Sequence, residues 1–165
     1  MAKFQGTIGD DRIIGTDSAD IVEGKAGNDI IKGLGGNDLL KGDGGHDRIY
    51  GGSGRDEIQG DAGNDRLFGN GGNDILEGGI GNDFLRGGSG SDLFVFGDVN
   101  GGQDRIADFQ DGLDRIEFDL DTVNSMNDLT IRQLAGGNTL VEWDTGSVVL
   151  VDFSAASLTV DDFLF

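Results

Sequence analysis

An aspartate recurs at every ninth position over much of the chain, and this period constrains the fold more than any other feature. The ten aspartates are Asp11, Asp20, Asp29, Asp38, Asp47, Asp56, Asp65, Asp74, Asp83 and Asp92. An apolar residue lies two positions after each, and a glycine lies five and two positions before most of them. The unit reads G-x-x-G-x-D-x-Φ-x, where Φ is apolar. Such a period is typical of a solenoid in which stacked turns bury one side chain per unit.

Eight consecutive units carry both glycines without insertion. Their pairs are Gly24 and Gly27, Gly33 and Gly36, Gly42 and Gly45, Gly51 and Gly54, Gly60 and Gly63, Gly69 and Gly72, Gly78 and Gly81, and Gly87 and Gly90. The first two units are less regular, because Thr7 and Thr16 follow the first glycine and Ser18 replaces the second glycine of its unit. These two units are predicted to form an entry cap.

Each unit divides into a longer turn and a short strand, so two consecutive units form one complete coil. The predicted fold is all-β, a right-handed parallel β-roll of such coils with a small β-rich carboxyl-terminal cap. Alternate aspartates then stack on the same side. We call the column of Asp11, Asp29, Asp47, Asp65 and Asp83 the first edge. The column of Asp20, Asp38, Asp56, Asp74 and Asp92 is the second edge.

Charge predicts that these columns need a cation. Asp and Glu total 31 against 12 Lys and Arg, which gives a net charge of -19. Carboxylates one rung apart, about 4.8 Å, repel by about 1 kcal/mol in water and by about 3 to 4 kcal/mol at an effective dielectric constant of 20. Divalent ions between successive turns would reverse this repulsion, and a flexible, carbonyl-rich turn favours Ca²⁺ over Mg²⁺.

Five stacked turns on each edge give a ceiling of about eight intercoil ions, and folding and metal binding become one equilibrium. The expected ligands are the ten repeat aspartates, Asp104 further along the chain, and the turn glycines from Gly24 to Gly72 through their carbonyl oxygens.

Composition excludes several other classes. Cysteine is absent and there is one histidine, so neither disulfides nor a zinc site is expected. Nucleic acid is not an expected partner, because its phosphates would be repelled. No segment has the length and apolarity of a classical export signal or a membrane span. His46 occupies a variable turn position and is interpreted as a surface residue, and no serine or threonine has a plausible imidazole partner, so the chain is not expected to be an enzyme.

The period ends near residue 96, and we predict a repeat domain over residues 1–96 and a cap with its own small core over residues 97–165. Two echoes of the repeat, at Gly102–Asp104 and Gly112–Asp114, predict irregular closing coils. Alternating apolar stretches at residues 129–134, 139–143 and 147–151 predict strands joined by two hairpin turns. The adjacent acids Asp161 and Asp162 are interpreted as a solvated tail or an export signal.

These units resemble the glycine- and aspartate-rich nonapeptide repeats of RTX proteins, with the pattern GGxGxDxUx. Residues 51–59, 78–86 and 87–95 match it fully, and the signal covers more than half of the chain. Other units differ at the second letter of this pattern, directly after the first glycine, and we expect this position to tolerate substitution. The residues found there are Lys25, Leu34, Asp43, Asp61 and Asn70. The resemblance implies a parallel β-roll with calcium held between turns by the aspartates and by backbone carbonyls.

The carboxyl-terminal region is also similar to the end of exported RTX proteins, in residues 102–109, 112–118 and 158–165. This resemblance implies passage through the type I secretion machinery on an uncleaved carboxyl-terminal signal. The expected location is therefore extracellular, as a secreted bacterial protein. Calcium scarcity inside the cell would keep the chain unfolded, and millimolar calcium outside would fold it, which suits dissociation constants of about 10⁻⁴ to 10⁻³ M.

One pattern leaves a second function open. Basic and aromatic residues gather at the outward strand positions of one side, among them Arg48, Tyr50, Arg66, Phe68 and Arg86. They either offset the field of the aspartates or bind an anionic polysaccharide. The accessory repeat modules of alginate-modifying epimerases resemble this chain in size and layout, which implies a polysaccharide-binding module accessory to an epimerase or lyase.

The expected function is a non-catalytic calcium-binding module that folds after export. It would be a monomer, either the carboxyl-terminal part of a larger secreted protein or a complete small protein. The competing interpretations are the carbohydrate-binding module, a metal-free glycine-rich spacer, and an enzyme whose site lies in the cap.

Overall fold

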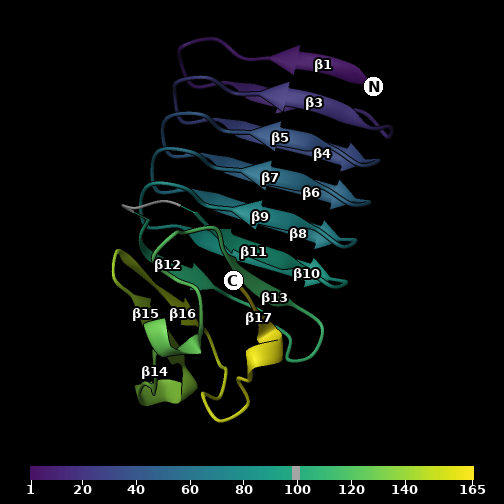
Figure 1. Ribbon diagram of the computed structural model, residues 1–165. Coiled ribbons are helices and arrows are strands. Elements are labelled where there is room, and N and C mark those ends of the chain that lie inside the picture. The colour runs from purple at the N-terminus through teal and green to yellow at the C-terminus, as the bar shows by residue number, and fades with distance from the viewer. Residues whose placement is uncertain (98–100) are drawn as a thin grey trace.

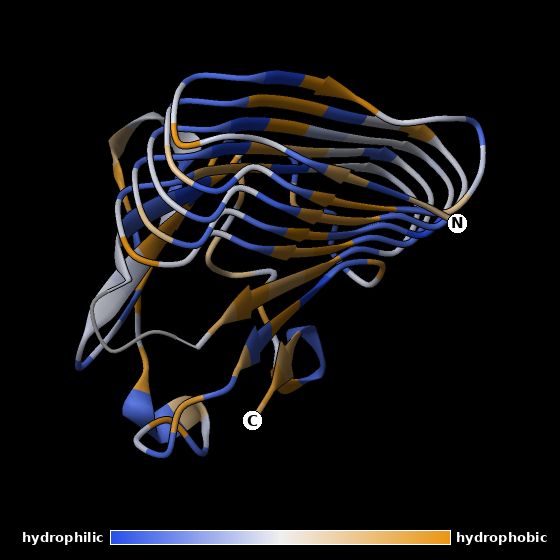
Figure 2. Ribbon diagram, turned by 90° about the horizontal axis from the view of Figure 1, so that it is seen from above, coloured by the Kyte–Doolittle hydropathy of each residue, from blue (hydrophilic) through white to orange (hydrophobic). Residues whose placement is uncertain are grey.

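Two sheets face each other across a narrow core and are joined by turns along both edges (Figures 1 and 2). A computed structural model describes residues 1–97 and 101–165. The first sheet runs β1-β3-β5-β7-β9-β11-β13-β17 and the second runs β14-β15-β16-β12-β10-β8-β6-β4-β2. Alternate strands therefore enter opposite sheets, which confirms the predicted parallel β-roll.

The strands of the first sheet, which we call sheet A, are β1 (Ala2–Gln5), β3 (Asp20–Glu23), β5 (Leu39–Lys41), β7 (Glu57–Gln59), β9 (Ile75–Glu77), β11 (Leu93–Phe96), β13 (Arg115–Phe118) and β17 (Phe163–Leu164). Those of the second, sheet B, are β2 (Arg12–Ile14), β4 (Ile30–Gly35), β6 (Arg48–Ser53), β8 (Arg66–Gly71), β10 (Phe84–Ser89), β12 (Gly102–Ile106), β14 (Thr130–Gln133), β15 (Thr139–Trp143) and β16 (Gly146–Leu150). Short 3-10 helices lie at Met126–Asp128, Ala135–Gly137 and Val160–Asp162.

Stacked strands in the regular body are aligned so that each residue pairs with the one two repeat units further along the chain. Ile31, Ile49 and Leu67 are aligned partners in sheet B, and Leu40 and Ile58 are aligned in sheet A. Because side chains alternate across a strand, the central residue of each strand points inward and its neighbours point outward. The prediction of one buried apolar residue per unit is confirmed from Val22 to Phe94, whereas Ile13 of the first unit is half-buried.

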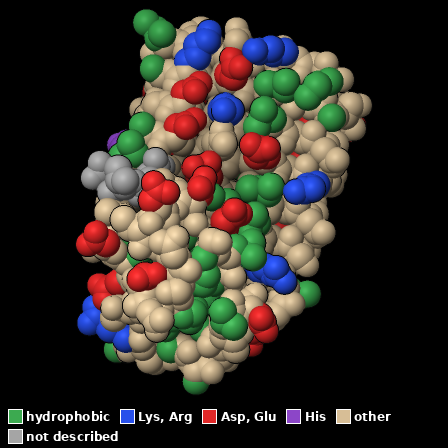
Figure 3. All heavy atoms as spheres, viewed as in Figure 1, with side chains coloured by type: hydrophobic (Ala, Val, Ile, Leu, Met, Phe, Trp, Pro, Cys, Tyr) green, Lys and Arg blue, Asp and Glu red, His purple; other side chains and the backbone are tan. Residues whose placement is uncertain are grey.

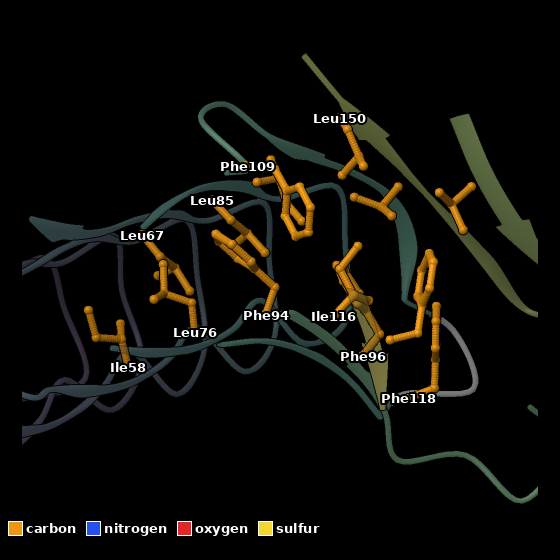
Figure 4. Packing of buried hydrophobic residues seen from close by; sticks show 14 of the residues in the cluster. Ile58, Leu67, Leu76, Leu85, Phe94, Phe96, Phe109, Ile116, Phe118 and Leu150 are labelled. Atoms are coloured by element: carbon orange, nitrogen blue, oxygen red, sulfur yellow. The ribbon is translucent and has the colours of Figure 1, made fainter. Parts of the chain in front are cut away.

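The core is one continuous row of apolar side chains from the coils into the cap (Figure 4). Ile58, Leu67 and Leu76 in the body have no exposed surface, and the row continues through Phe94 and Ile116. Aromatic rings then close the end, with Trp143 at 5.1 Å and Phe163 at 6.2 Å from Phe118, centroid to centroid. The cap therefore does not enclose a separate core, contrary to expectation.

The predicted closing coils and strands are present. β12 pairs in parallel with β10, β13 pairs with β11, and β14, β15 and β16 form an antiparallel meander whose last strand joins β12. Gly136 and Gly137, in the predicted hairpin connection, have φ of 83° and 86°, which glycine adopts readily. The division into residues 1–96 and 97–165 remains a proposal, because both sheets continue across it.

The carboxyl-terminal segment is folded, so the interpretation of a solvated tail is wrong for Asp162, whereas Asp161 is exposed. Asp162 is 3% exposed, and its Oδ2 accepts hydrogen bonds from the backbone N–H and the hydroxyl of Thr159 at 2.7 and 3.0 Å. Phe163 is buried, and β17 pairs with β13. Among the described residues, no helix has the length and apolarity needed to cross a membrane.

Candidate metal centre

The repeat aspartates form two columns that link successive coils. In each column the backbone N–H of one aspartate donates to Oδ1 of the aspartate in the next coil, as from Asp47 to Asp65 at 2.7 Å and from Asp56 to Asp74 at 2.9 Å. The first edge continues beyond Asp83, whose backbone N–H donates to Oδ1 of Asp104 at 2.8 Å. The sequence-predicted aspartates are therefore brought together, and one oxygen of each joined carboxylate is used in the protein itself.

The other carboxylate oxygen is buried without a partner. Within residues 1–97 and 101–165, Oδ2 receives no hydrogen bond at Asp29, Asp38, Asp47, Asp56, Asp65, Asp74 and Asp92. These residues are at most 3% exposed. A buried anionic oxygen without a partner costs several kcal/mol, so the columns provide a row of oxygen donors that need a positive charge.

Glycine makes room for this charge beside each carboxylate. A Cβ added to Gly24 would lie 2.5 Å from Oδ2 of Asp29 and 2.7 Å from the carbonyl oxygen of Gly42 in the next coil. The same overlap occurs at Gly33, Gly42, Gly51, Gly60 and Gly69, each against its own aspartate and the first glycine of the following coil. The carboxylate and the carbonyl therefore converge on a space that any larger residue would fill.

The glycines two positions before the aspartates are needed for a different reason. Gly45 and Gly63 have φ of 134° and 146°, and a Cβ at either would overlap the carbonyl oxygen of the equivalent glycine one coil earlier. The positive φ and the overlap with the carbonyl oxygen both exclude a side chain at these positions. The turns are kept closely stacked in the same way by the glycines at equivalent positions, Gly27, Gly36, Gly54 and Gly72.

The position four before each aspartate, directly after the first glycine of the unit, is more constrained than the sequence suggested. Lys25, Leu34, Asp43, Asp61 and Asn70 occupy it with φ between 68° and 83°. Left-handed backbone costs a residue with a side chain about 1 kcal/mol, less for Asp and Asn. The position thus accepts substitution at an energetic cost, which is largest at Leu34 and Lys25.

The irregular units have a different turn. Oδ2 of Asp11 accepts the N–H and hydroxyl of Thr7 at 2.6 and 2.8 Å, and Oδ2 of Asp20 accepts those of Thr16 at 2.7 and 2.8 Å. We call these closed turns, because the protein already satisfies the carboxylate. Open turns are those in which the residue four before the aspartate has positive φ, from the turn of Asp29 to that of Asp92.

Asp114 was missed by the sequence analysis as a member of the second edge. Its Oδ1 accepts the N–H of Asp92 at 2.9 Å, and its Oδ2 accepts the N–H of Gln110 at 2.9 Å, so its turn is closed. The sequence signal that could have identified it is Gly112, which lies two positions before Asp114 as in the repeat units. Residues 98–100, which precede Asp104 in the sequence, lie outside the described residues.

Burial makes the column carboxylates hard to ionise. It raises the pKa to about 6 for Asp47, Asp56 and Asp92, to about 7 for Asp65 and Asp74, and to about 8 for Asp104. The hydrogen bond from the neighbouring coil opposes this rise, and nearby carboxylates add to it. At Asp11 the pKa is instead lowered, chiefly by the backbone N–H of Thr7. The open turns are therefore electrostatically destabilised, and the closed turn of Asp11 is not.

His46 has a structural role that the sequence did not reveal. Its N–H donates to Oδ1 of Asn28 at 2.9 Å, and its Nδ1 accepts the N–H of Asn64 at 2.8 Å. Asn82 continues this side-chain ladder by donating its N–H to Asn64 at 2.8 Å. His46 therefore replaces an asparagine as one link on the outside of the first edge.

The donor set fits a hard divalent cation. Nowhere in residues 1–97 and 101–165 do three histidine, cysteine, aspartate or glutamate side chains converge on one point, so backbone oxygens must complete the coordination shell. Carboxylate and carbonyl oxygens in a flexible glycine turn are the ligands that Ca²⁺ prefers.

Comparison with known proteins supports this interpretation. The chain matches the family model of the RTX calcium-binding nonapeptide repeat over residues 5–40, 23–58, 41–76, 59–94 and 68–106. These stretches cover more than half of the 165 residues. The chain therefore belongs to the RTX calcium-binding repeat family, as predicted. The comparison with curated proteins found no match.

Solved structures share the fold. The AlgE6R3 subunit of the mannuronan C5-epimerase from Azotobacter vinelandii is 30% identical with a TM-score of 0.58, over 78% of this chain and 80% of that one. The AlgE6R2 subunit is 27% identical with a TM-score of 0.53, over 82% and 91%. The extracellular lipase LipA from Serratia marcescens aligns with the whole chain at 20% identity and a TM-score of 0.54, but this chain spans only 40% of the lipase.

Proposed function

We propose that the chain is a non-catalytic module of a secreted bacterial protein, which folds when calcium binds between its coils. The observation that carries the proposal is the row of buried Oδ2 atoms that have no partner among the described residues, of which Asp56 and Asp65 are central examples. When bound, calcium supplies the positive charge that these oxygens lack. The protein's own residues set the geometry, through the stacked aspartates and the glycine carbonyls.

The structure supports a smaller number of ions than the ceiling of about eight. Six spaces have an open turn on both sides. They lie between the turns of Asp29 and Asp47, Asp47 and Asp65, Asp65 and Asp83, Asp38 and Asp56, Asp56 and Asp74, and Asp74 and Asp92. The spaces next to Asp11 and Asp20 face carboxylates already satisfied by threonine, so we propose six intercoil ions.

Circular dichroism during a calcium titration tests the proposal, with magnesium as the control ion. The chain should be disordered in chelator and gain β-structure with calcium. Magnesium should fail at the same concentrations, because it demands a small octahedral shell. Equal β-structure in chelator and in calcium would exclude the proposal.

Export through the type I secretion machinery remains part of the proposal, supported by the resemblance at residues 102–118 and 158–165. The folded carboxyl-terminal segment is compatible with it, because a chain kept unfolded by low calcium would expose that segment during passage. We also propose that the module is a monomer. Fusion of residues 97–165 to a reporter, with secretion measured in a type I-competent host, tests the export step.

A second candidate function is binding of an anionic polysaccharide, and the outer face of sheet B favours it. Six successive strands, β2 to β12 in sheet B, each present one cation outward, and none presents an acid. The cations are Arg12, Lys32, Arg48, Arg66, Arg86 and Arg105. Of this row, within the described residues, only Arg86 makes an ion pair, with Asp108 at 3.3 Å, so the row does not neutralise the aspartates by contact.

The aromatic residues on this face support ionic recognition. Tyr50 stacks on Phe68 at 4.9 Å, and Arg66 lies over the ring of Phe84 at 5.0 Å. Ring faces are therefore covered, whereas the guanidinium groups of Arg48 and Arg66 make no ion pair among the described residues and are available to carboxylates. By contrast, Figure 3 shows acidic side chains scattered over the face of the molecule viewed in Figure 1. The epimerase neighbours, whose enzyme acts on mannuronan, are consistent with this candidate.

Calorimetry with short uronate oligomers, too short to gel with calcium, tests this second candidate on the calcium-loaded protein. Arg48→Ala, Arg66→Ala and Tyr50→Ala should each weaken binding. Lys41→Ala, on the outer face of sheet A, should leave it unchanged. Absence of heat with the wild-type protein would remove the candidate without affecting the calcium proposal.

A further inference from the structure

The two edges differ at the residue four positions before each repeat aspartate. On the first edge the open turns carry Lys25, Asp43, Asp61 and Gly79 at this position. On the second edge they carry Leu34, Gly52, Asn70 and Gly88. Two additional carboxylates therefore lie in adjacent coils of one edge, and the other edge has none at this position.

Asp43 and Asp61 are held beside the intercoil spaces by the turn backbone. Both have positive φ, 68° and 69°, and the N–H of Ala62 donates to the carbonyl of Asp43 at 2.8 Å. Oδ2 of Asp43 accepts the N–H of Lys25 at 3.0 Å. The carboxylate of Asp43 thus spans the rim of the space between the turns of Asp29 and Asp47.

The charges of these two residues reach the buried columns. Burial is the main cause that raises the pKa of Asp47 to about 6, and the charges of Asp29 and Asp43 add to it. Burial likewise raises the pKa of Asp65 to about 7, with Asp61 among the neighbouring charges that contribute. On the second edge, Asp56 is affected by burial and by Asp38 of its own column.

The central spaces of the two edges can therefore be compared directly. The two turns that bound the space between Asp47 and Asp65 contain four carboxylates: Asp47 and Asp65 of the column, Asp61, and Asp43, which reaches back toward the turn of Asp29. The matching space on the second edge lies between the turns of Asp56 and Asp74. That space is flanked by the two column carboxylates alone, and Arg55 directly precedes Asp56 in the chain. Both central spaces contain buried Oδ2 atoms with no partner among the described residues.

We infer that the edges bind calcium unequally, and that the space between the turns of Asp47 and Asp65 is the tightest site and the first to fill. This inference rests on the proposed calcium-dependent folding. Asp43 and Asp61 act on the site through their charge, and Oδ2 of Asp43 is already engaged by the N–H of Lys25. Ordering of the coils would begin at this central space and spread to both ends of the body.

The test uses isosteric changes and calcium chloride as the probe. Calorimetric titration of the wild-type chain should resolve a tight and a weak class of sites. Asp43→Asn with Asp61→Asn should weaken the tight class by about two- to fivefold per carboxylate, the scale of one charge near a divalent ion in screened solvent. Asparagine tolerates left-handed backbone as aspartate does, so the turn is retained.

A gain-of-charge variant provides the matched experiment on the other edge. Asn70→Asp should tighten the second-edge sites by a similar factor. Amide NMR signals of Gly54 and Gly72, in second-edge turns, should then shift at lower calcium, while those of Gly45 and Gly63 should shift as before. High salt should reduce both effects, because the Debye length falls to about 3 Å at 1 M.

Two outcomes overturn the inference: one indistinguishable class of sites in the wild-type chain, or unchanged second-edge affinity in Asn70→Asp. The second remains informative even if the Asp43 and Asp61 variant fails to fold. Failure of the underlying proposal is recognised separately, since the wild-type chain would then have the same β-structure with and without calcium.

Discussion

The repeat body and the cap accommodate their acidic turns in different ways. In the body, Asp56 and Asp65 are buried with Oδ2 unpaired within the described residues. In the cap, Oδ2 of Asp128 accepts the N–H of Asn124 and the hydroxyl of Ser125, at 3.1 and 3.0 Å, and Asp162 is satisfied by Thr159. The comparison teaches that a carboxylate capped by its own turn is stable alone, whereas a carboxylate stacked in an open column requires an external cation.

Removal of calcium should have the largest effect and tests whether the cap is independent. Chelation should abolish the β-structure of the body, and the fluorescence signature of buried Trp143 should be lost in the same transition. The reason is that β12 and β13 pair directly with the last body strands. Far-UV circular dichroism and tryptophan fluorescence measured together check this. Retention of the Trp143 signal would show that the cap folds alone.

Loss of one column charge should have the next largest effect. Asp65→Asn keeps an Oδ1 acceptor for the N–H of Asp47 but removes the charge from an open turn. It should raise the calcium midpoint of folding several-fold. Asp20→Asn, in a closed turn, is the matched comparison: it replaces an acceptor of Thr16 but removes no open-turn charge, so it should shift the midpoint less than Asp65→Asn does. Equal shifts in the two variants would contradict the distinction between open and closed turns.

Acidification should affect the open columns of the body and the closed turn of Asp128 in opposite directions. The pKa values of Asp65 and Asp74 are raised by burial to about 7, so the folded body binds more protons than the unfolded chain between about pH 4 and pH 7. Its calcium-free stability should therefore rise as the pH falls through this window. The pKa of Asp128 is lowered, chiefly by the backbone N–H of Asn124, so its contribution is present at neutral pH and is lost in acid.

Circular dichroism of metal-stripped protein from pH 8 to pH 5 measures this effect. The β-structure of the body should increase in acid, and the calcium midpoint of the same protein should rise because protons compete for the columns. A calcium-free signal that is flat across the range would contradict the burial of ionised carboxylates in the body.

Backbone strain should give the smallest effect. Leu34 is 43% exposed with φ of 83°, so Leu34→Gly relieves the left-handed conformation and loses little burial. It should stabilise the calcium-loaded protein by about 0.5 to 1 kcal/mol, measured as a rise of a few degrees in Tm. Gly136→Leu in the cap, also at positive φ, should destabilise by a similar amount.

The period alone was sufficient to predict the coil, the two edges and the inward row, because two units per coil set the alignment of every stacked strand in the body. It could not predict that Thr7 and Thr16 close their turns, since this depends on which N–H group faces Oδ2. Asp114 was missed because Phe109 stands where a glycine would mark the unit. The burial of Asp162 depends on pairing with a strand far away in the sequence, which no local pattern records.

The uniform register also limits how this molecule can grow. Adding two repeat units to the body would insert one more coil and leave both sheets, both edges and the cap junction in phase. Adding a single unit would exchange the sheets for everything downstream, so that an arginine row would continue onto the opposite surface. Lengthening of such a chain during evolution should therefore proceed in whole coils, with the aromatic closure carried along unchanged.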